Sequence, residues 1–418
     1  MIEWLKLENF KNFSEAKLFC GPVTLLMGIN AAGKSNLRDA FRLLLGIGLG
    51  YNLAEIFGRR YTSGQLQWSG IRGGLSEVTY FGSTTFSLTI KFKLRSSYQY
   101  KIEIAPKLST RPQVVAESLY CDQKMLFDTR PNQDASPQIE INIARDERCQ
   151  KEHTLAVNTA QPVLTQILEE SSFSERTDSA AKEVRRGVQA TLTTFRALCF
   201  FDLIPNSMRE PSFLGQNLGD RGENLSSVLA DICKNPTQKA RKEALVAWVK
   251  ALTPMDVQDF EFTEDQMGRV LVTLVESAGR KTSAYSASDG TLRFLAIAAA
   301  LLNPHIKSCF FEELENGIHP TRLHLLLDLI EQTTLHNDTQ VIATTHSPQL
   351  LRLISPATLD YTSLIYRLPD ESTGHIQRLV DLPQPALDIL RKKNLAQLYE
   401  SGWFENVVNL LSEEKRSS

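Results

Sequence analysis

The stretch GINAAGKS at residues 28–35 decides the fold of this chain. It matches the pattern G-x-x-x-x-G-K-[S/T] in full, and the apolar run VTLLM at residues 23–27 leads into it. A strand that runs through such a loop into a helix surrounds a polyphosphate with backbone N–H groups and a helix N-terminus. Lys34 is expected to reach the β and γ phosphates, and the Ser35 hydroxyl is expected to bind Mg²⁺. The stretch therefore predicts an α/β fold with a nucleotide phosphate site.

The loop itself requires glycine at two positions. A side chain at Gly28 or Gly33 would collide with the phosphates or forbid the backbone angles. A helix is predicted to follow over residues 34–45. The residues expected to hold the nucleotide are consecutive: Asn30, Ala31, Ala32, Gly33, Lys34, Ser35 and Asn36. A glycine-containing turn that merely resembles the motif is the alternative.

An acidic pair follows a second apolar run in CFFEELENGIHP, residues 309–320. Neighbouring side chains of a strand point to opposite sides, so Glu312 and Glu313 can divide two tasks. Glu312 can bind the hydration shell of Mg²⁺, while Glu313 orients or deprotonates the attacking water. The alternative is an acidic turn on the protein surface.

A histidine ends a third apolar run in VIATTHSPQLL, residues 341–351. At the carboxyl end of a buried parallel strand, His346 lies on the edge where α/β sheets bind ligands. It can hydrogen-bond a γ-phosphate or the attacking water. Taken alone, a structural histidine is the more common interpretation.

A small polar loop opens the apolar helix of YSASDGTLRFLAIAAALL, residues 285–302. Ser288 and the N–H groups around Gly290 form a second anion site. An N-capped core helix explains this segment equally well when it is considered alone. The order of loop, capped helix, acidic strand and histidine strand is what makes chance coincidence improbable.

Length and composition exclude several classes of protein. The chain has 418 residues, 42% of them hydrophobic, and its charge sum of 46 basic minus 48 acidic residues is −2. It is therefore neither disordered nor a general polycationic coat for nucleic acid. Its six cysteines form no CxxC pair, and no apolar run approaches the length of a membrane span. A reducing cytoplasm and no membrane attachment are expected.

The pattern along the chain predicts one interrupted domain. Antiparallel strands are expected between residues 79 and 104, and strands and helices alternate after residue 256. Helical spacing over residues 161–198 and 224–252 indicates an insertion. The predicted units are an N-terminal lobe (1–105), a mostly helical lid (106–254), a C-terminal lobe (255–370) and a helical tail (371–418).

Together these motifs resemble the ABC-type ATPase head of the RecF, SMC and OLD families of P-loop ATPases, a group that includes stand-alone heads of bacterial anti-phage defence systems. The opening MIEWLKLENFKNF resembles the first strand of that head, and SASDGT resembles its signature, with Asp289 where glycine is usual. FFEELENGIHP resembles its Walker B strand, with Glu312 in place of aspartate. The fold class implied is α/β, an ABC-type head with an antiparallel β subdomain and a mostly helical lid.

The resemblance implies a head-to-tail homodimer that encloses two ATP molecules with Mg²⁺. Ser288 and Gly290 of one subunit would close over the γ-phosphate held by the other, and Lys11 would contact the nucleotide. Lys34, Glu313 and His346 would carry hydrolysis, with Ser35 and Glu312 as the metal ligands. The chain is too short for coiled-coil arms or for the nuclease domain of OLD proteins, so a separate effector subunit, a nuclease or toxin encoded nearby, is expected.

Three functions remain open at this point. The first is an ATP-driven switch that controls such an effector in phage defence, with DNA as a possible trigger. The second is a RecF-like repair ATPase that binds duplex DNA through basic residues: Arg59, Arg60, Arg72, Lys182, Arg185 and Arg186. The third is the nucleotide-binding subunit of a transporter, which the LENFKNF and THSP segments disfavour. A hexameric AAA+ motor has no use for a signature segment.

Overall fold

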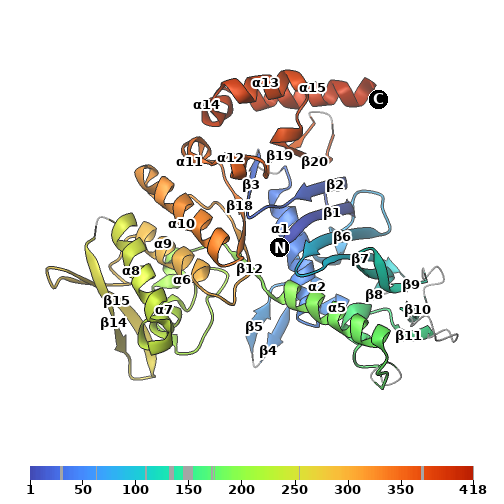
Figure 1. Cartoon of the computed structure of the whole chain (residues 1–418), viewed down its shortest axis with the longest axis horizontal. Helices are drawn as coiled ribbons and strands as arrows, with labels where there is room; N and C mark the ends of the chain where they lie inside the picture. Colours follow the sequence, from blue (N-terminus) through green and yellow to red (C-terminus); the bar gives the residue numbers. More distant parts are fainter. Residues whose placement is uncertain are drawn as a thin grey trace.

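The computed structural model describes most of the chain, and Figure 1 shows the arrangement of its elements. The described residues are 1–28, 32–62, 64–108, 111–130, 136–144, 154–170, 173, 175–253, 255–368 and 371–417. They form a mixed α/β structure around two main sheets, one largely parallel and one antiparallel. The predicted fold class is confirmed at this level.

The parallel sheet has the order β12-β17-β18-β3-β19-β20. Its strands are β12 (Leu198–Phe201), β17 (Ser308–Phe311), β18 (Gln340–Thr344), β3 (Val23–Gly28), β19 (Thr362–Arg367) and β20 (Gly374–Arg378), of which only β20 runs antiparallel to its neighbour. The apolar runs predicted as buried strands are β3, β17 and β18, and every residue of these strands is buried. Because parallel strands share one carboxyl edge, the loops after β3, β17 and β18 meet there.

The antiparallel sheet has the order β11-β10-β9-β8-β7-β6-β1-β2. It comprises β1 (Ile2–Phe10), β2 (Phe13–Phe19), β6 (Phe86–Lys93), β7 (Ser97–Leu108), β8 (Arg111–Cys121), β9 (Lys124–Thr129), β10 (Gln138–Ile143) and β11 (Thr154–Asn158). The predicted strands between residues 79 and 104 correspond to β6 and β7. A short hairpin, β4 (Arg60–Thr62) and β5 (Gln65–Trp68), stands apart.

The predicted mostly helical lid is wrong in its first third. Residues 111–158 carry β8 to β11, which extend the antiparallel sheet. The turn residues in this segment obscured the alternation of buried apolar side chains that marks the strands, as in Ile139 and Ile141 of β10. The rest of the segment is mainly helical, but its helices divide between two cores, so no single lid exists in the described residues.

One core lies between the two sheets. It encloses α1 (Lys34–Gly48) and α5 (Ser179–Arg196), with α2 (Leu53–Phe57) and α3 (Val163–Gln166) at its edge. Phe200 and Phe310 of the parallel sheet point into this core, whereas their neighbours Phe201 and Phe311 point into the other. The period of two along each strand therefore decides which face each aromatic side chain covers.

The second core lies on the opposite face of the parallel sheet. It contains α6 (Pro205–Met208), α7 (Leu225–Lys234), α8 (Lys239–Leu252), α9 (Asp289–Leu301) and α10 (Leu323–His336). A small antiparallel sheet covers these helices, formed by β13 (Ser212–Phe213), β14 (Val257–Glu264), β15 (Arg269–Glu276) and β16 (Lys281–Ser283). Figure 1 shows this lobe apart from the large antiparallel sheet, with the parallel sheet between them.

The C-terminal helices form a third layer, drawn in red in Figure 1. They are α13 (Gln384–Lys392), α14 (Leu395–Glu400) and α15 (Trp403–Ser417), and they pack with α11 (Pro348–Leu353) and α12 (Pro356–Leu359). Within the segment predicted as a helical tail, residues 374–378 form strand β20 and the helices begin at residue 384. Among the described residues, no helix has the length and apolar character needed to cross a membrane.

A buried carboxylate ties the antiparallel sheet to α3. Glu117 of β8 accepts hydrogen bonds from the Val163 and Leu164 backbone N–H groups, at 2.7 and 2.8 Å, and from the Tyr100 hydroxyl at 2.9 Å. Burial raises the pKa of this carboxyl to about 7 from its usual 4.5. The folded state therefore holds a proton that the unfolded state releases, so this group's contribution to stability falls as pH rises from about 4.5 to 7.

We expect Glu117→Ala to destabilise the protein by about 3 kcal/mol, because three buried donors lose their acceptor. Thermal unfolding followed by circular dichroism at pH 5.5 will show this as a lower midpoint. Glu140→Ala, which removes an exposed carboxylate paired with Arg130 in the same sheet, is the control and should change stability by less than about 1 kcal/mol. Equal midpoints for the two variants would contradict the role given to Glu117.

Candidate functional site

The glycine loop leaves β3 and enters α1 as predicted. Gly28 has φ 149°, and a Cβ atom there would lie 2.0 Å from the Ile365 carbonyl oxygen of β19. Gly33 has φ 124°, and a Cβ atom there would meet the Phe13 and Asn12 side chains within 3 Å. Both positions therefore exclude larger residues before any ligand is considered. Asn30 and Ala31, predicted to hold phosphate, lie outside the described residues.

A cavity of about 330 Å³ opens at the start of α1, on the carboxyl edge of the parallel sheet. Its lining brings together residues from four separate segments of the chain. These are Gly33, Lys34, Ser35, Asn36, Glu312, Glu313, Thr344, His346 and Arg367. Most of the predicted catalytic, phosphate and metal residues thus share one cavity, although Gly33 and His346 are 313 positions apart in the chain.

Lys34 is the cation at the base of this cavity. Its Nζ donates a 2.7 Å hydrogen bond to the Gly28 carbonyl, so the side chain turns back toward the end of β3. Burial lowers the pKa of the Lys34 ammonium to about 8, and the Glu313 carboxylate partly opposes that effect. A phosphate at this position would favour the charged ammonium, since each stabilises the other.

The phosphate-loop helix is braced from outside the cavity. Asp39 of α1 is buried and pairs with Lys11 and with Arg72, whose Nε lies 3.2 Å from Asp39 Oδ2. Lys11 also donates to the Arg72 carbonyl at 2.9 Å. Lys11 does not line the 330 Å³ cavity. It lines a neighbouring cavity of about 270 Å³, which shares Asn36 and Arg367 with the first.

The two predicted carboxylates diverge at the end of β17. Glu312 forms an ion pair with Arg38, whose Nη1 lies 3.1 Å from Glu312 Oε1. Arg38 lies one turn after Lys34 on α1. Glu313 has φ 47°, its N–H donates to Thr344 Oγ1 at 2.8 Å, and its carboxylate accepts from Asn316 Nδ2 at 3.0 Å. A positive φ at a residue other than glycine costs conformational energy and is concentrated at functional sites.

His346 follows β18 and faces the same cavity. Its backbone N–H donates to Glu315 Oε1 at 2.9 Å, and its ring Nδ1 lies 3.5 Å from the Tyr399 hydroxyl of α14. Burial lowers the pKa of His346, with a further contribution from Lys34, while Glu313 and Glu315 act in the opposite direction. The imidazole is therefore neutral at pH 7 and can present an N–H or a lone pair to the cavity.

The predicted signature residues lie elsewhere. Ser288 is the N-cap of α9, and its Oγ accepts the Thr291 N–H at 3.2 Å. A Cβ atom on Gly290 would lie 2.4 Å from the Gly317 carbonyl, so the start of α9 lies against the turn that follows the acidic pair. Neither residue lines the phosphate cavity of its own chain.

Several cavity or support residues escaped the sequence analysis. Arg38 lies four positions after Lys34, a spacing that places both on one helix face and could have indicated it. Arg367 ends a strand of the parallel sheet, so the rule for the carboxyl edge could have found it once β19 was assigned. Tyr399 gave no signal, because only the docking of α14 beside α11 brings it to His346.

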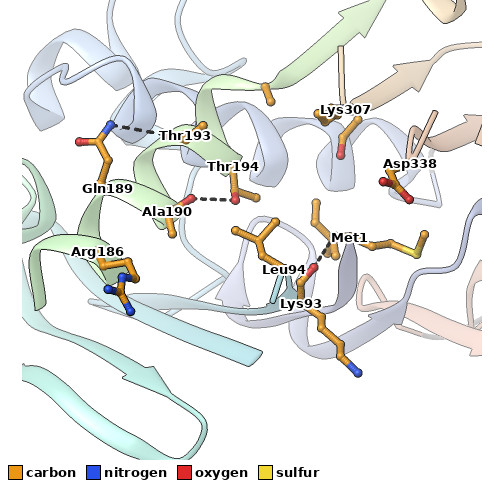
Figure 2. Close-up of a pocket in the computed structure, with 13 residues that line it drawn as sticks. Met1, Lys93, Leu94, Arg186, Gln189, Ala190, Thr193, Thr194, Lys307 and Asp338 are labelled. Atoms are coloured by element: carbon orange, nitrogen blue, oxygen red, sulfur yellow. Dashed lines mark hydrogen bonds between the residues drawn. The ribbon is translucent and has the colours of Figure 1, made fainter. Parts of the chain in front are cut away.

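A larger cavity, of about 770 Å³, lies at the other edge of the parallel sheet. Figure 2 shows it between α5, the end of β6 and the start of β17, with Thr194, Leu94 and Lys307 around it. Ser308 and Asp338 place it at the amino ends of β17 and β18. Since α/β sheets bind their ligands at the carboxyl ends of strands, the smaller cavity is the candidate nucleotide site.

Comparison with known proteins agrees with this assignment. Residues 204–352 match the family model described as "AAA domain, putative AbiEii toxin, Type IV TA system". An "ATP/GTP phosphatase" of Helicobacter pylori (strain ATCC 700392 / 26695) is 23% identical over 430 residues, covering 98% of this chain and the full length of the relative. These two matches support a nucleotide-hydrolysing protein of the P-loop class.

Solved structures resemble the fold. An SMC head bound to the C-terminal winged-helix domain of ScpA matches with a TM-score of 0.52 and 12% identity, covering 90% of this chain and 97% of its own. A Pyrococcus furiosus SMC head with an extended coiled coil, bound to the C-terminal domain of ScpA, matches with a TM-score of 0.50 and 11% identity, covering 94% and 98%. The chain therefore shares the fold of SMC head domains.

Proposed function

We propose that this protein hydrolyses ATP and that two copies associate head to tail around the nucleotide. The observation that carries the proposal is the convergence of Lys34, Glu313 and His346 on one cavity that Ser288 and Gly290 do not reach. In the head-to-tail arrangement, the capped start of α9 from one subunit supplies the anion site that completes the cavity of the other.

The residues divide the reaction among them. Lys34 and the first N–H groups of α1 hold the β and γ phosphates. Glu313 accepts a proton from the attacking water or orients it; the hydrogen bond from its backbone N–H to Thr344 fixes its main chain, and the Asn316 amide holds its carboxylate. His346, fixed by Glu315, hydrogen-bonds the γ-phosphate or the water.

The donors present fit Mg²⁺, which prefers oxygen ligands. The Ser35 hydroxyl and the Glu312 carboxylate would hold the ion, and both line the cavity. Glu312 can serve although Arg38 occupies one of its oxygens, because a carboxylate has further lone pairs. When bound, Mg²⁺ neutralises charge on the phosphate oxygens.

Ser288→Arg tests the head-to-tail arrangement. We expect the variant to bind ATP as the wild type does but to lose ATP-dependent dimerisation by at least about tenfold, because a bulky cation replaces the capping hydroxyl at the proposed interface. Sedimentation velocity with and without Mg-ATP measures the dimer, and isothermal titration calorimetry measures ATP binding.

The control is Thr263→Arg, which adds the same side chain at an exposed position of β14 in the same lobe. It should dimerise like the wild type. Undiminished dimerisation of the Ser288→Arg protein would contradict the arrangement proposed.

We propose that the ATP cycle acts as a switch for a partner effector, a nuclease or toxin subunit in phage defence. Two findings support this: the matching family model names a toxin–antitoxin system, and the similar SMC heads are bound to another protein. A reducing cytoplasm fits the free thiols of the described cysteines Cys20, Cys121, Cys199, Cys233 and Cys309. Affinity capture from the native cell with and without ATP, followed by a nuclease assay of the captured partner, tests the switch.

Three of the six basic residues predicted to bind duplex DNA already have partners in the structure. Arg60 pairs with Glu55, Arg72 pairs with Asp39, and Arg185 donates to the Phe173 and Arg176 carbonyls. These three cations already have partners, so they offer less to a phosphate backbone than free side chains would.

A further inference from the structure

An ion pair spans the start of α9, where the proposed anion site lies. Arg209 Nη2 donates to Asp289 Oδ1 at 2.6 Å and to the Ala287 carbonyl at 3.0 Å. Ala287 and Asp289 are the two neighbours of Ser288, so a single guanidinium holds both flanks of the capping residue. Arg209 is also tethered on the other side, where Nη1 donates to Asn206 Oδ1 at 3.2 Å.

Asp289 creates a problem for an anion site. It is the first residue of α9, and its side chain is 66% exposed. A carboxylate in the first turn stabilises an isolated helix, since it complements the helix dipole. It opposes the approach of a phosphate to the same N–H groups, because the two negative charges repel each other.

Arg209 is placed to remove that repulsion. It follows α6, whose Met208 is part of the core of the second lobe, and its side chain is only 21% exposed. The cation is therefore held rigidly beside Asp289 instead of moving freely in solvent. Arg293, a cation within α9 itself, lies against Gly317 instead.

We propose that Arg209 is the positioning residue that allows the α9 start to accept an anion. It neutralises the Asp289 carboxylate and fixes residues 287–289, so that Ser288 and the N–H groups around Gly290 face the γ-phosphate of a second copy. This inference rests on the proposed head-to-tail ATP dimer. It goes further by assigning the affinity of the anion site to an ion pair supplied by a distant segment of the chain.

The test compares four proteins on a Glu313→Gln background, which is expected to retain ATP: unchanged, Arg209→Ala, Asp289→Asn and the double variant. Sedimentation velocity over a range of protein concentrations with Mg-ATP gives the dimer dissociation constant of each. Calorimetry of ATP binding at concentrations below that constant reports the subunit's own phosphate loop. Arg269→Ala is the control, since it removes another arginine–aspartate pair, 2.8 Å long, from the same lobe.

We expect Arg209→Ala to weaken the ATP-bound dimer by at least about tenfold, because like charges across an interface are costly. Asp289→Asn should dimerise at least as well as the unchanged protein. The double variant should regain dimerisation to within about threefold, because the removal of the carboxylate removes the need for its counter-ion. ATP affinity of the single subunit and the thermal midpoint should stay unchanged in Asp289→Asn and in the control.

Two results would overturn the inference. One is an Arg209→Ala protein that dimerises like the unchanged protein. The other is a double variant as weak as Arg209→Ala alone, which would mean that Arg209 acts only by shaping the loop. A Glu313→Gln protein that binds ATP yet stays monomeric would overturn the dimer itself, and that outcome is distinguishable because it precedes any change at Arg209.

Discussion

The Lys34→Ala protein is expected to bind Mg-ATP at least about 100-fold more weakly than the wild type. The ammonium is the cation at the base of the phosphate cavity, and a charge-assisted hydrogen bond to phosphate contributes about 1.5–3 kcal/mol, with a further electrostatic contribution from the charge itself. Its loss also removes the 2.7 Å bond to the Gly28 carbonyl, which ties the start of α1 to the end of β3.

Isothermal titration calorimetry measures the affinity, and thermal unfolding without nucleotide shows whether the fold is retained. Lys6→Ala is the control, because Lys6 pairs with Glu8 and Glu15 on the surface of the antiparallel sheet and does not line the proposed nucleotide cavity or the 270 Å³ cavity beside it. An affinity within threefold of the wild type in Lys34→Ala would refute the assignment of this cavity to phosphate.

The Glu313→Gln protein is expected to hydrolyse ATP at least about 100-fold more slowly while binding it normally, because general base catalysis contributes roughly 10²–10⁴ in rate. The amide keeps the shape of the side chain and can still accept from Asn316, but it cannot take a proton. ATP-bound dimers should therefore accumulate instead of dissociating after hydrolysis.

Phosphate release in single-turnover experiments measures the rate, and sedimentation with Mg-ATP measures the dimer. Glu264→Gln, at an exposed position of β14, serves as the matched control and should hydrolyse ATP at the wild-type rate. Hydrolysis at the wild-type rate by Glu313→Gln would show that another group activates the water.

The grouping of the site residues could be expected from the sequence because it follows from one rule. Apolar runs that end in Gly28, Glu312 and Thr344 are parallel strands, and their carboxyl ends meet on one edge of the sheet. The position of Lys11 could not be predicted in this way, because it depends on an ion pair with Asp39, a buried residue of α1. No spacing in the sequence indicated that ion pair.

The error in the predicted lid has a similar origin. Strands β9 to β11 are short, turns separate the strands from β8 onward, and all four extend an antiparallel sheet that earlier strands have begun. The helices that follow were predicted, yet α5 covers the antiparallel sheet and α7 packs with α9. Which core a helix joins depends on surfaces made by distant segments.

The sequence by itself determined the phosphate loop, the parallel strands that feed the site and the acidic and histidine ends of two of them. These are local properties, set by glycine conformations, apolar periodicity and the common edge of parallel strands. Only the tertiary structure determined which ion pairs form around the candidate site and at the start of α9: Asp39 with Lys11, Glu312 with Arg38, and Asp289 with Arg209. Such pairs form between segments 28, 274 and 80 positions apart, and the geometry that selects one partner among the 46 basic residues exists only after the cores have packed.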